Sequence, residues 1–228
     1  MYEAKIDPLL YLDKVPNYFL LHNKSIKSIE IPANIVSIGY AAFIDCSGLT
    51  NVTIGNGVTS IGNGAFYDCS SLASVKIPDS VTSIGDLAFS DCSGLTNISI
   101  PDSVKSIGEA AFSRCRSLKS VIIGNSVDYI SKDAFMWCDK LTTVVIGDNV
   151  KWIGDSAFHA CESLKNIELP DGIEEIGVAA FGNCKSLTTI KYLGLKKEAL
   201  LKLNGKNKRW RDWSKIKKII CIDGDINL

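Results

Sequence analysis

Seven cysteines recur at a fixed spacing of 23 residues and are the side chains most able to do chemistry in this chain. They are Cys46, Cys69, Cys92, Cys115, Cys138, Cys161 and Cys184. Thiols can form disulfides, bind metals or act as nucleophiles. Metal sites draw their ligands from cysteines that lie a few residues apart, whereas each 23-residue repeat here supplies only one thiol. The pattern therefore favours a buried column of reduced thiols that pack as small hydrophobic side chains, with a disulfide framework as the alternative.

Few other residues are arranged for catalysis. The chain has two histidines, His22 and His159. Neither lies at a sequence spacing from a nucleophile or an acidic residue that would indicate a catalytic pair. The sequence contains no phosphate-binding loop, no H-E-x-x-H motif and no nucleophile elbow. Carboxylates such as Asp79, Asp102 and Asp171 fall in turns, where they cap backbone groups. We therefore expect a protein that is not an enzyme and that uses no cofactor or metal.

The elements that position the thiols repeat with the same period. A phenylalanine ladder precedes the cysteines by three residues, and a leucine ladder follows them by three. The two ladders are Phe43, Phe66, Phe89, Phe112, Phe135, Phe158 and Phe181, and Leu49, Leu72, Leu95, Leu118, Leu141, Leu164 and Leu187. Unrelated core positions do not share one period over seven cycles. The sequence therefore predicts a solenoid in which each unit buries its apolar face against the next.

One unit, residues 72–93, shows how the chain is expected to run. The apolar residues of the run L-x-x-V-x-I, which begins at Leu72, alternate as in a strand with one buried face, and Pro78 ends that strand. A second short apolar segment follows at 81–84. The Ala-Phe pair at 88–89 indicates a single helical turn that places the ring in the core. The unit is too short for a full helix, so we expect parallel strands connected by short turns or one-turn helices.

The limits of the repeat divide the chain into three segments. Residues 1–25 are interpreted as an N-terminal cap with a decayed repeat. Residues 26–192 hold seven 23-residue repeats and a final strand, and residues 193–228 leave the period as a basic C-terminal cap. Terminal repeats depart from the consensus because their outer side has no neighbour to cover it. Within the C-terminal cap, the spacing predicts a helix at 195–203 and a closing strand at 219–222.

The repeat resembles that of the BspA-like leucine-rich repeat family. The shared signature, L-x-x-I-x-I-P-x-x-V-x-x-I-G-x-x-A-F-x-x-C, recurs along residues 26–192. The resemblance implies a right-handed, curved leucine-rich-repeat stack with parallel strands on its concave face. It also implies a non-enzymatic role in binding proteins or surfaces. Because the family is diverse in function, the resemblance says little about the partner.

Charge and hydropathy exclude several classes of protein. The chain has 25 basic and 25 acidic residues, so no global attraction to nucleic acid is expected. Residues 196–218 hold ten basic and two acidic residues, a net charge of +8, which leaves −8 for the rest of the chain. No stretch is long enough to span a membrane, and no secretion signal is visible at the N-terminus. We expect a cytoplasmic location, or the cell surface if an export segment has been removed.

At seven variable positions in two consecutive repeats, the residue type differs from that in most other repeats. These seven residues are the first candidate site. They are Ile122, Tyr129, Met136, Trp137, Val145, Trp152 and His159. Aromatic and methionine side chains on a surface that is otherwise rich in Ser, Thr and Asn indicate a protein interface. They could form one patch or two, since Ile122 and Val145 fall on first strands and the others on later segments. The alternative is that the rings cover imperfect packing between ordinary repeats.

The basic C-terminal cap is the second candidate site. Its tryptophans are interleaved with cations, in the set Lys208, Arg209, Trp210, Arg211, Trp213 and Lys215. Aromatic rings that stack on bases, among cations that bind phosphates, are typical of proteins that bind single-stranded nucleic acid. The alternative is that the tryptophans plug the open end of the solenoid while the lysines face water.

Together these patterns favour a protein-binding scaffold without catalysis, as an intracellular inhibitor or effector that docks on a partner protein. One alternative is an exported surface adhesin of the BspA-like kind. Another is a nucleic-acid or nucleoprotein contact through the basic cap. The location of the native protein separates the first two, and a steep salt dependence of binding would identify the third.

Overall fold

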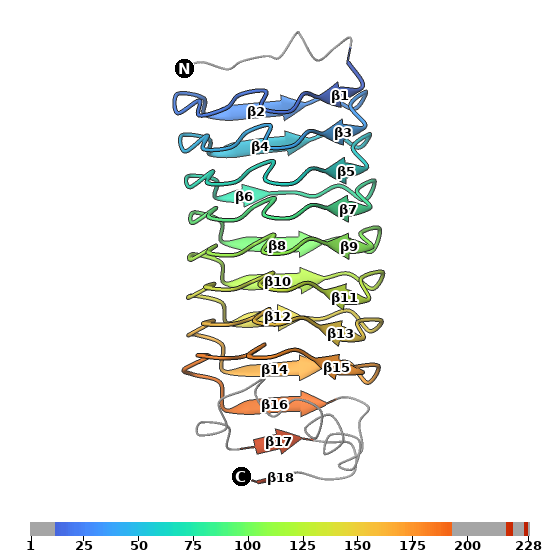
Figure 1. The fold of residues 1–228 in the computed structure, drawn as a ribbon, viewed down its shortest axis with the longest axis vertical. Coiled ribbons are helices and arrows are strands. Elements are labelled where there is room, and N and C mark those ends of the chain that lie inside the picture. The colour runs from blue at the N-terminus through green and yellow to red at the C-terminus, as the bar shows by residue number, and fades with distance from the viewer. Residues whose placement is uncertain (1–11, 193–217, 221–225, 228) are drawn as a thin grey trace.

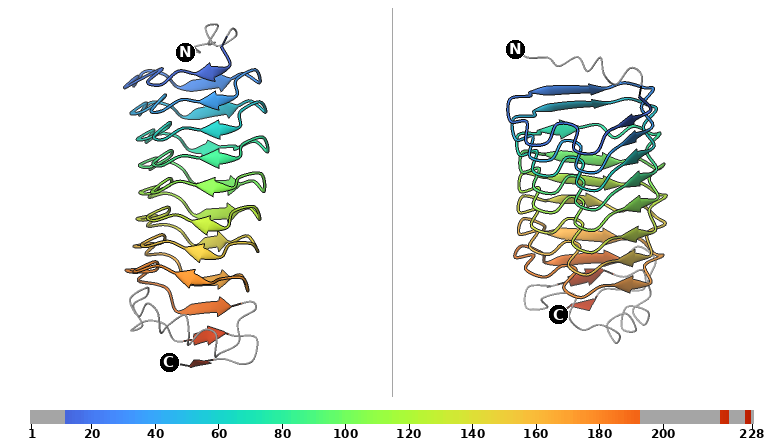
Figure 2. Two further views of the ribbon diagram at one scale, coloured as in Figure 1. Left: turned by 45° about the vertical axis from the view of Figure 1, so that its right-hand side comes forward. Right: turned by 45° about the horizontal axis from the view of Figure 1, so that its top comes forward.

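The chain is wound into a solenoid of stacked coils (Figure 1). The computed structural model describes residues 12–192, 218–220 and 226–227. Each 23-residue repeat forms one coil, with a first strand, a second strand and a segment of turns around the phenylalanine of the repeat. Figure 2 shows the coils lying one above the next, and no helix is present among the described residues. The predicted solenoid of parallel strands is confirmed, and each coil is named below by its phenylalanine.

The first strands form one side of the stack. They are β2 (Ser28–Ile31), β4 (Asn51–Ile54), β6 (Ser74–Val75), β8 (Asn97–Ile100), β10 (Ser120–Ile123), β12 (Thr143–Val145), β14 (Asn166–Leu169) and β16 (Thr189–Tyr192). Their hydrogen bonding is divided into three sheets, β2-β4-β6, β8-β10-β12 and a third that contains β14 and β16. Side chains alternate along each strand, so Ile98 and Ile100 of β8 are buried while Asn97 and Ser99 face solvent.

The second strands form a continuous parallel sheet on another side of the stack. They are β1 (Lys14–Val15), β3 (Ser37–Ile38), β5 (Ser60–Ile61), β7 (Ser83–Ile84), β9 (Ser106–Ile107), β11 (Tyr129–Ile130), β13 (Trp152–Ile153) and β15 (Glu175–Ile176). In every one, the second residue is buried in the core and the first lies outside it. The side chain at that first position therefore decides what the sheet presents to solvent.

The two ends of the stack differ from the central coils. Near the N-terminus, Leu20 packs against the core at the phenylalanine position, and Asn23 Oδ1 accepts hydrogen bonds from the N–H groups of Ser25 and Ile26, each at 3.1 Å. At the other end, β17 (Lys218–Ile220) pairs parallel with β16, and β18 (Ile226–Asn227) pairs antiparallel with β17. Strand β17 overlaps the expected closing strand, whereas β18 was not predicted. The helix expected at 195–203 lies outside the described residues.

Turns, rather than one-turn helices, form the third side of each coil. We call this side the turn wall, which runs from two residues before each phenylalanine to two residues after it. The helical turn predicted at 88–89 is not formed, because the backbone is left-handed on both sides of it: Leu87 has φ 55° and Asp91 has φ 59°. The equivalent positions are left-handed in the other described coils as well. Left-handed backbone costs a non-glycine residue about 1–2 kcal/mol, so another interaction must hold the turn wall in this shape.

Hydrogen bonds between coils provide that interaction. In the Phe112 coil, the N–H groups of Ala110, Phe112 and Arg114 donate to carbonyl oxygens of the next coil at 2.7–3.0 Å. Every coil from that of Leu20 to that of Phe158 donates the same three N–H groups, always toward its C-terminal neighbour. The left-handed residues turn alternate N–H groups out of the coil and toward that neighbour. The shape of the turn wall is therefore set by contact between coils.

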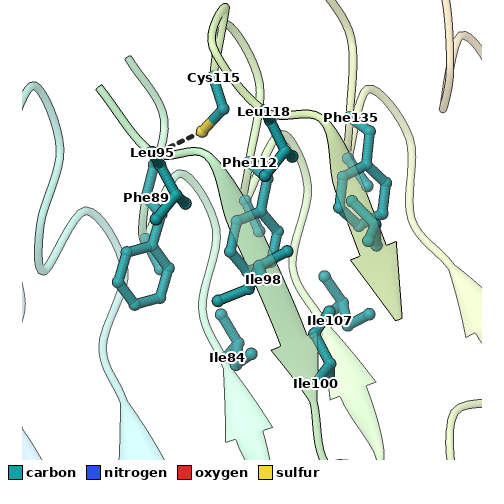
Figure 3. Close-up of a cluster of buried hydrophobic side chains, with 14 of the residues drawn as sticks. Ile84, Phe89, Leu95, Ile98, Ile100, Ile107, Phe112, Cys115, Leu118 and Phe135 are labelled. Atoms are coloured by element: carbon teal, nitrogen blue, oxygen red, sulfur yellow. Dashed lines mark hydrogen bonds between the residues drawn. The ribbon is translucent and has the colours of Figure 1, made fainter. Parts of the chain in front are cut away.

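The phenylalanine rings form a continuous stack through the core (Figure 3). Centroids of neighbouring rings lie 5.1–5.6 Å apart, and their planes differ by 4–18°. Strand side chains such as Ile98 and Ile107 lie near the rings in the same cluster, together with Leu118. All these side chains are buried, which confirms the predicted phenylalanine and leucine ladders. The ring stack couples each coil to the coils on both sides of it.

The repeat cysteines form a second buried column, as predicted, and all seven are free thiols. Each thiol also makes a hydrogen bond that was not predicted. Its Sγ lies 3.0–3.3 Å from the carbonyl oxygen of the phenylalanine of the preceding coil, or of Leu20 in the first case. Figure 3 shows the bond from Cys115 to Phe89. Burial raises the pKa of Cys46 to about 11, and it raises the pKa of Cys115 well above its ordinary value.

We expect the column thiols to resist chemical modification in the folded protein. A thiol reagent reacts with the thiolate, and both burial and the raised pKa keep these groups protonated at neutral pH. In a Cys221→Ser variant, which leaves the column thiols, native labelling should be at least about 100-fold slower than labelling in denaturant. Labelling can be followed by mass spectrometry of intact protein. Rapid native labelling of several column thiols would contradict their burial.

Candidate interaction surface

The seven candidate residues lie on all three sides of two neighbouring coils, those of Phe135 and Phe158. Ile122 and Val145 lie on the first strands β10 and β12, and Tyr129 and Trp152 on the second strands β11 and β13. Met136, Trp137 and His159 lie on the turn wall. The structure therefore divides the candidate residues into two pairs and a trio, where the sequence left open one patch or two.

The first-strand pair consists of two exposed aliphatic side chains side by side. Ile122 and Val145 are register partners on β10 and β12, and their exposed fractions are 46% and 50%. The same position holds Ser99 in the preceding coil and Glu168 in the following one. Glu168 Oε1 accepts a hydrogen bond of 2.9 Å from Lys191 Nζ. An apolar pair thus interrupts a column that is otherwise polar or charged.

A shallow groove of about 630 Å³ lies beside this pair, over β8, β10 and β12, and Ile122 and Val145 are part of its lining. Its edge carries a series of turn residues whose backbone and side chains are hydrogen-bonded to one another. The N–H of Asn125 donates to Asp102 Oδ1 at 2.6 Å, and the N–H of Asp148 donates to Asn125 Oδ1 at 2.9 Å. These bonds order the edge, so the groove presents an apolar floor beside fixed polar groups.

The second-strand pair consists of two aromatic side chains in register. Tyr129 and Trp152 are partners on β11 and β13; Tyr129 is 43% exposed and Trp152 is half-buried. Lys151 Nζ lies 5.7 Å from the centroid of the Trp152 ring and 3.7 Å from Glu174 Oε1. A cation already lies over the tryptophan, in an arrangement that is attractive because of the negative face of the ring.

A smaller hollow of about 290 Å³, which we call the second-strand groove, lies beside the aromatic pair. Its charged and aromatic lining residues are Glu109, Tyr129, Lys132, Trp152, Asp155 and Glu175. Ile153, Gly154 and Gly177 complete the lining, and a Cβ at Gly177 would clash with the backbone nitrogen of Asp155, so the close approach requires glycine. Burial raises the pKa of Tyr129, and the carboxylates of Asp155, Glu109 and Glu175 raise it further. The second-strand groove is therefore lined by aromatic rings and carries a net negative charge.

The turn-wall trio makes contacts within the chain. The rings of Trp137 and His159 meet edge-on, with centroids 6.2 Å apart. The Asn183 amide nitrogen lies 3.1 Å from His159 Nε2, which therefore accepts the hydrogen bond. His159 Nδ1 is buried without a hydrogen-bond partner among the described residues. His159 was expected to be exposed, but it is half-buried, as are Met136 and Trp137. These contacts favour the packing interpretation for the trio.

The repeat is shared with a known family of repeat proteins. Six copies of the BspA type leucine-rich repeat region match the chain, over residues 13–142 and 84–198. The chain belongs to this family. Members of the BspA-type family typically act as protein-interaction or surface scaffolds, and leucine-rich repeat proteins are generally non-catalytic. A comparison with curated proteins finds no match.

Solved structures of bacterial leucine-rich repeat proteins resemble this one. A leucine-rich repeat protein of T. pallidum is 27% identical, with a TM-score of 0.64, over 87% of this chain and 79% of its own. One from Bacteroides ovatus is 26% identical, with a TM-score of 0.57, over 78% of this chain. One from Eubacterium ventriosum, at 21% identity and a TM-score of 0.58, shows the fold alone. The chain spans 58% of the Bacteroides ovatus protein and 57% of the Eubacterium ventriosum protein.

Sequence reasoning missed two features of this BspA-type surface. The acidic lining of the second-strand groove was not identified, although Glu175 follows Trp152 at the same repeat position. Two exposed tyrosines in the first coils, Tyr18 and Tyr40, also went unnoticed; their rings meet edge-on with centroids 5.2 Å apart. Tyr40 stands where the next repeat has Asn63, so comparison down that column could have found it.

The second candidate site cannot be placed in this BspA-type stack. Lys208, Arg209, Trp210, Arg211, Trp213 and Lys215 all lie outside the described residues. Within the described part of the chain, no cluster of His, Cys, Asp or Glu side chains could hold a metal ion. The same residues include no helix that is long and apolar enough to cross a membrane. The two strand pairs and their grooves are therefore the surface to consider further.

Proposed function

We propose that this BspA-type chain is a non-enzymatic scaffold that binds a partner protein through the Phe135 and Phe158 coils. One observation carries the proposal: large apolar side chains are paired in register on adjacent coils, Ile122 with Val145 and Tyr129 with Trp152. Such pairs are fixed on hydrogen-bonded strands, so a partner can bury them without first ordering a loop. Exposed aromatic and aliphatic groups on a polar surface are typical anchors of protein interfaces.

The fold itself does not need these side chains. Ser60, Ser83 and Ser106 stand at the position of Tyr129 and Trp152, in coils with the same strand pairing. Ser99 stands at the position of Ile122, again in an equivalent strand. Since serine suffices for the strand, the large apolar groups have no structural reason to be there. Their presence supports a role in binding.

Burial of the thiols supports the non-enzymatic part of the proposal. The seven column cysteines are the side chains with most potential as nucleophiles, and all are buried with hydrogen-bonded Sγ atoms. Burial raises the pKa of Cys92 and of Cys115 well above the ordinary value. A protonated, buried thiol cannot attack a substrate, so these cysteines serve the core.

We further propose that the scaffold works in the cytoplasm, as an inhibitor or effector that occludes a site on its partner. Protease added to intact native cells tests this location. The chain should survive in intact cells and be degraded only after lysis. Degradation in intact cells would instead favour a surface adhesin.

Capture of the native partner tests the binding surface. The chain is immobilised, exposed to a lysate of its native cell, and its bound proteins are identified by mass spectrometry. An Ile122→Ser/Val145→Thr variant gives the first-strand pair residues that other coils carry at this position, as in Ser99 and Thr53. We expect the partner to be retained at least about fivefold less well, because two apolar anchors are lost.

A Glu30→Ser variant is the matched control, because Glu30 stands at the same first-strand position in a coil outside the proposed surface. It should capture the partner as the unchanged chain does. If the Ile122→Ser/Val145→Thr variant also captures the partner normally, the first-strand pair is not part of the interface. Circular dichroism of all three proteins checks that the fold is kept.

A further inference from the structure

The second-strand groove carries an uncompensated negative charge. Glu109, Asp155 and Glu175 line it, and none of the three forms an ion pair with another described residue. Lys132 is the cation of this lining, and its Nζ lies 4.0 Å from the carboxylate of Asp133. Three exposed carboxylates thus face the same hollow as the aromatic pair. Bringing an opposite charge to this place is favourable, and bringing a like charge is unfavourable.

We propose that the second-strand groove binds a lysine- or arginine-bearing segment of the partner protein. The proposal rests on the proposed scaffold function and names the chemistry of the partner. A cationic side chain of that segment would lie against Trp152 and Tyr129 while its charge approaches Glu109, Asp155 and Glu175. Charge complementarity of this kind selects among partners and speeds their encounter.

The chain itself shows that this arrangement of groups holds a cation. Lys151 lies over the Trp152 ring and pairs with Glu174, one coil further along the stack. The groove repeats that combination, with Glu175 standing next to Trp152 on the neighbouring strand. A tryptophan face with a carboxylate beside it favours lysine or arginine over any neutral side chain.

The three carboxylates also act electrostatically on the same side chain of the groove, that of Tyr129. Asp155, Glu109 and Glu175 each raise the pKa of Tyr129, although burial of its ring is the larger cause. All three are therefore close enough to influence one point in the groove. Of them, Asp155 is also structural, because its Oδ1 accepts a hydrogen bond of 2.5 Å from the N–H of Val178. Glu109 and Glu175 are the better residues to change.

Peptide binding to the full-length chain tests the proposal. The probe is a fluorescein-labelled ten-residue peptide in which lysine and serine alternate, and its matched probe has glutamate in place of lysine. Fluorescence anisotropy is measured at low salt. We expect the lysine peptide to bind and the glutamate peptide not to bind. A Glu109→Gln/Glu175→Gln variant should bind the lysine peptide about fivefold more weakly, since two facing charges are lost.

A control variant separates this site from general attraction to an acidic surface. Glu30→Gln/Asp79→Asn removes the same charge from the first-strand side of the stack, far from the second-strand groove. It should bind the lysine peptide as the unchanged chain does. Equal weakening in both variants would overturn the proposal, because the peptide would then sense only the net charge.

Two further outcomes would also overturn it. Residues 196–218 of a second copy carry basic chemistry of the same kind. If sedimentation shows that the chain alone dimerises, and that Glu109→Gln/Glu175→Gln abolishes the dimer, the occupant is a second copy. If the native partner is lost with Ile122→Ser/Val145→Thr but captured normally by Glu109→Gln/Glu175→Gln, the scaffold function stands and the basic segment is wrong.

Discussion

Phe112→Ala is expected to lower the free energy of unfolding by about 3–5 kcal/mol, because it removes a buried ring and leaves a cavity. Phe112 has no exposed surface, and its ring lies 5.3 Å from that of Phe89 and 5.4 Å from that of Phe135, measured between centroids. The change therefore breaks the ring stack in the middle of the solenoid. Denaturant unfolding followed by circular dichroism measures the loss.

The same change should also weaken the coupling between the two halves of the stack. In a repeat protein, stability is the sum of the coils and of the contacts between neighbouring coils. We expect the single unfolding transition to broaden or to split in two. Ser106→Ala, an exposed position in the same coil, is the control and should leave stability within about 0.5 kcal/mol of the unchanged chain. Unchanged stability of Phe112→Ala would place Phe112 outside the core.

The second large effect is expected on binding. Tyr129→Ser/Trp152→Ser restores the residue that neighbouring coils carry, so the fold should tolerate it. Loss of two central aromatic anchors should weaken binding of the captured partner by about 2 kcal/mol or more. Calorimetry with the purified partner measures the affinity, and thermal unfolding checks that the variant is as stable as the unchanged chain.

A parallel variant tests the basic cap against the aromatic pair. Lys208→Gln/Arg209→Gln/Arg211→Gln removes three cations, and its effect on binding should shrink at high salt because exposed charges are screened. If this variant loses the partner while Tyr129→Ser/Trp152→Ser binds normally, the aromatic pair is packing and the cap is the site. If neither variant changes binding, the contact lies elsewhere, and the first strands are the next surface to test.

Much of the core could be predicted from the sequence because each core position touches its own counterpart in the next coil. Phe89 packs on Phe112 and Phe112 packs on Phe135, so a substitution in one repeat disturbs the packing of the neighbouring repeats. This requirement keeps the residue type constant along each column and makes the 23-residue period visible. The strand alternation around Ile98 and Ile100 follows in the same way from burial on one face.

The turn wall could not be predicted, because its backbone depends on the neighbouring coil. Leu87 and Trp137 adopt left-handed φ values of 55° and 61°, although their residue types seldom do. Asp45, Asp68, Asp91 and Asn183, in equivalent places, hint at such a backbone, since aspartate and asparagine tolerate it better. Gly64 and Asp133 do so at the position two residues before the phenylalanine. The thiol hydrogen bonds were hidden for the same reason, because their acceptors are carbonyl groups of another coil.

The candidate site was predicted in part for a similar reason. Comparison down each column shows that Tyr129 and Trp152 replace serine, whatever the shape of the coil. It does not show toward which side of the coil a column points. The structure places Trp137 on the turn wall and Trp152 on the second-strand sheet, so two residues of the same type have different surroundings. The carboxylates near Trp152 come from three coils and are unremarkable in each one alone.

The one-way hydrogen bonds give the turn wall a polarity, which is opposite to that of the bonds by which Lys105 and Gly108 donate to the preceding coil. Each peptide group carries a dipole of about 3.5 D with its positive end at the N–H, and aligned groups add. In a helix this sum runs along the chain, whereas in the turn wall it runs across successive coils, with the N–H groups pointing toward the C-terminal neighbour from the Leu20 coil to the Phe158 coil. Each coil of the wall thus presents N–H donors to its C-terminal neighbour and carbonyl acceptors to its N-terminal neighbour. A repeat inserted into this wall can therefore continue the ladder in one orientation only.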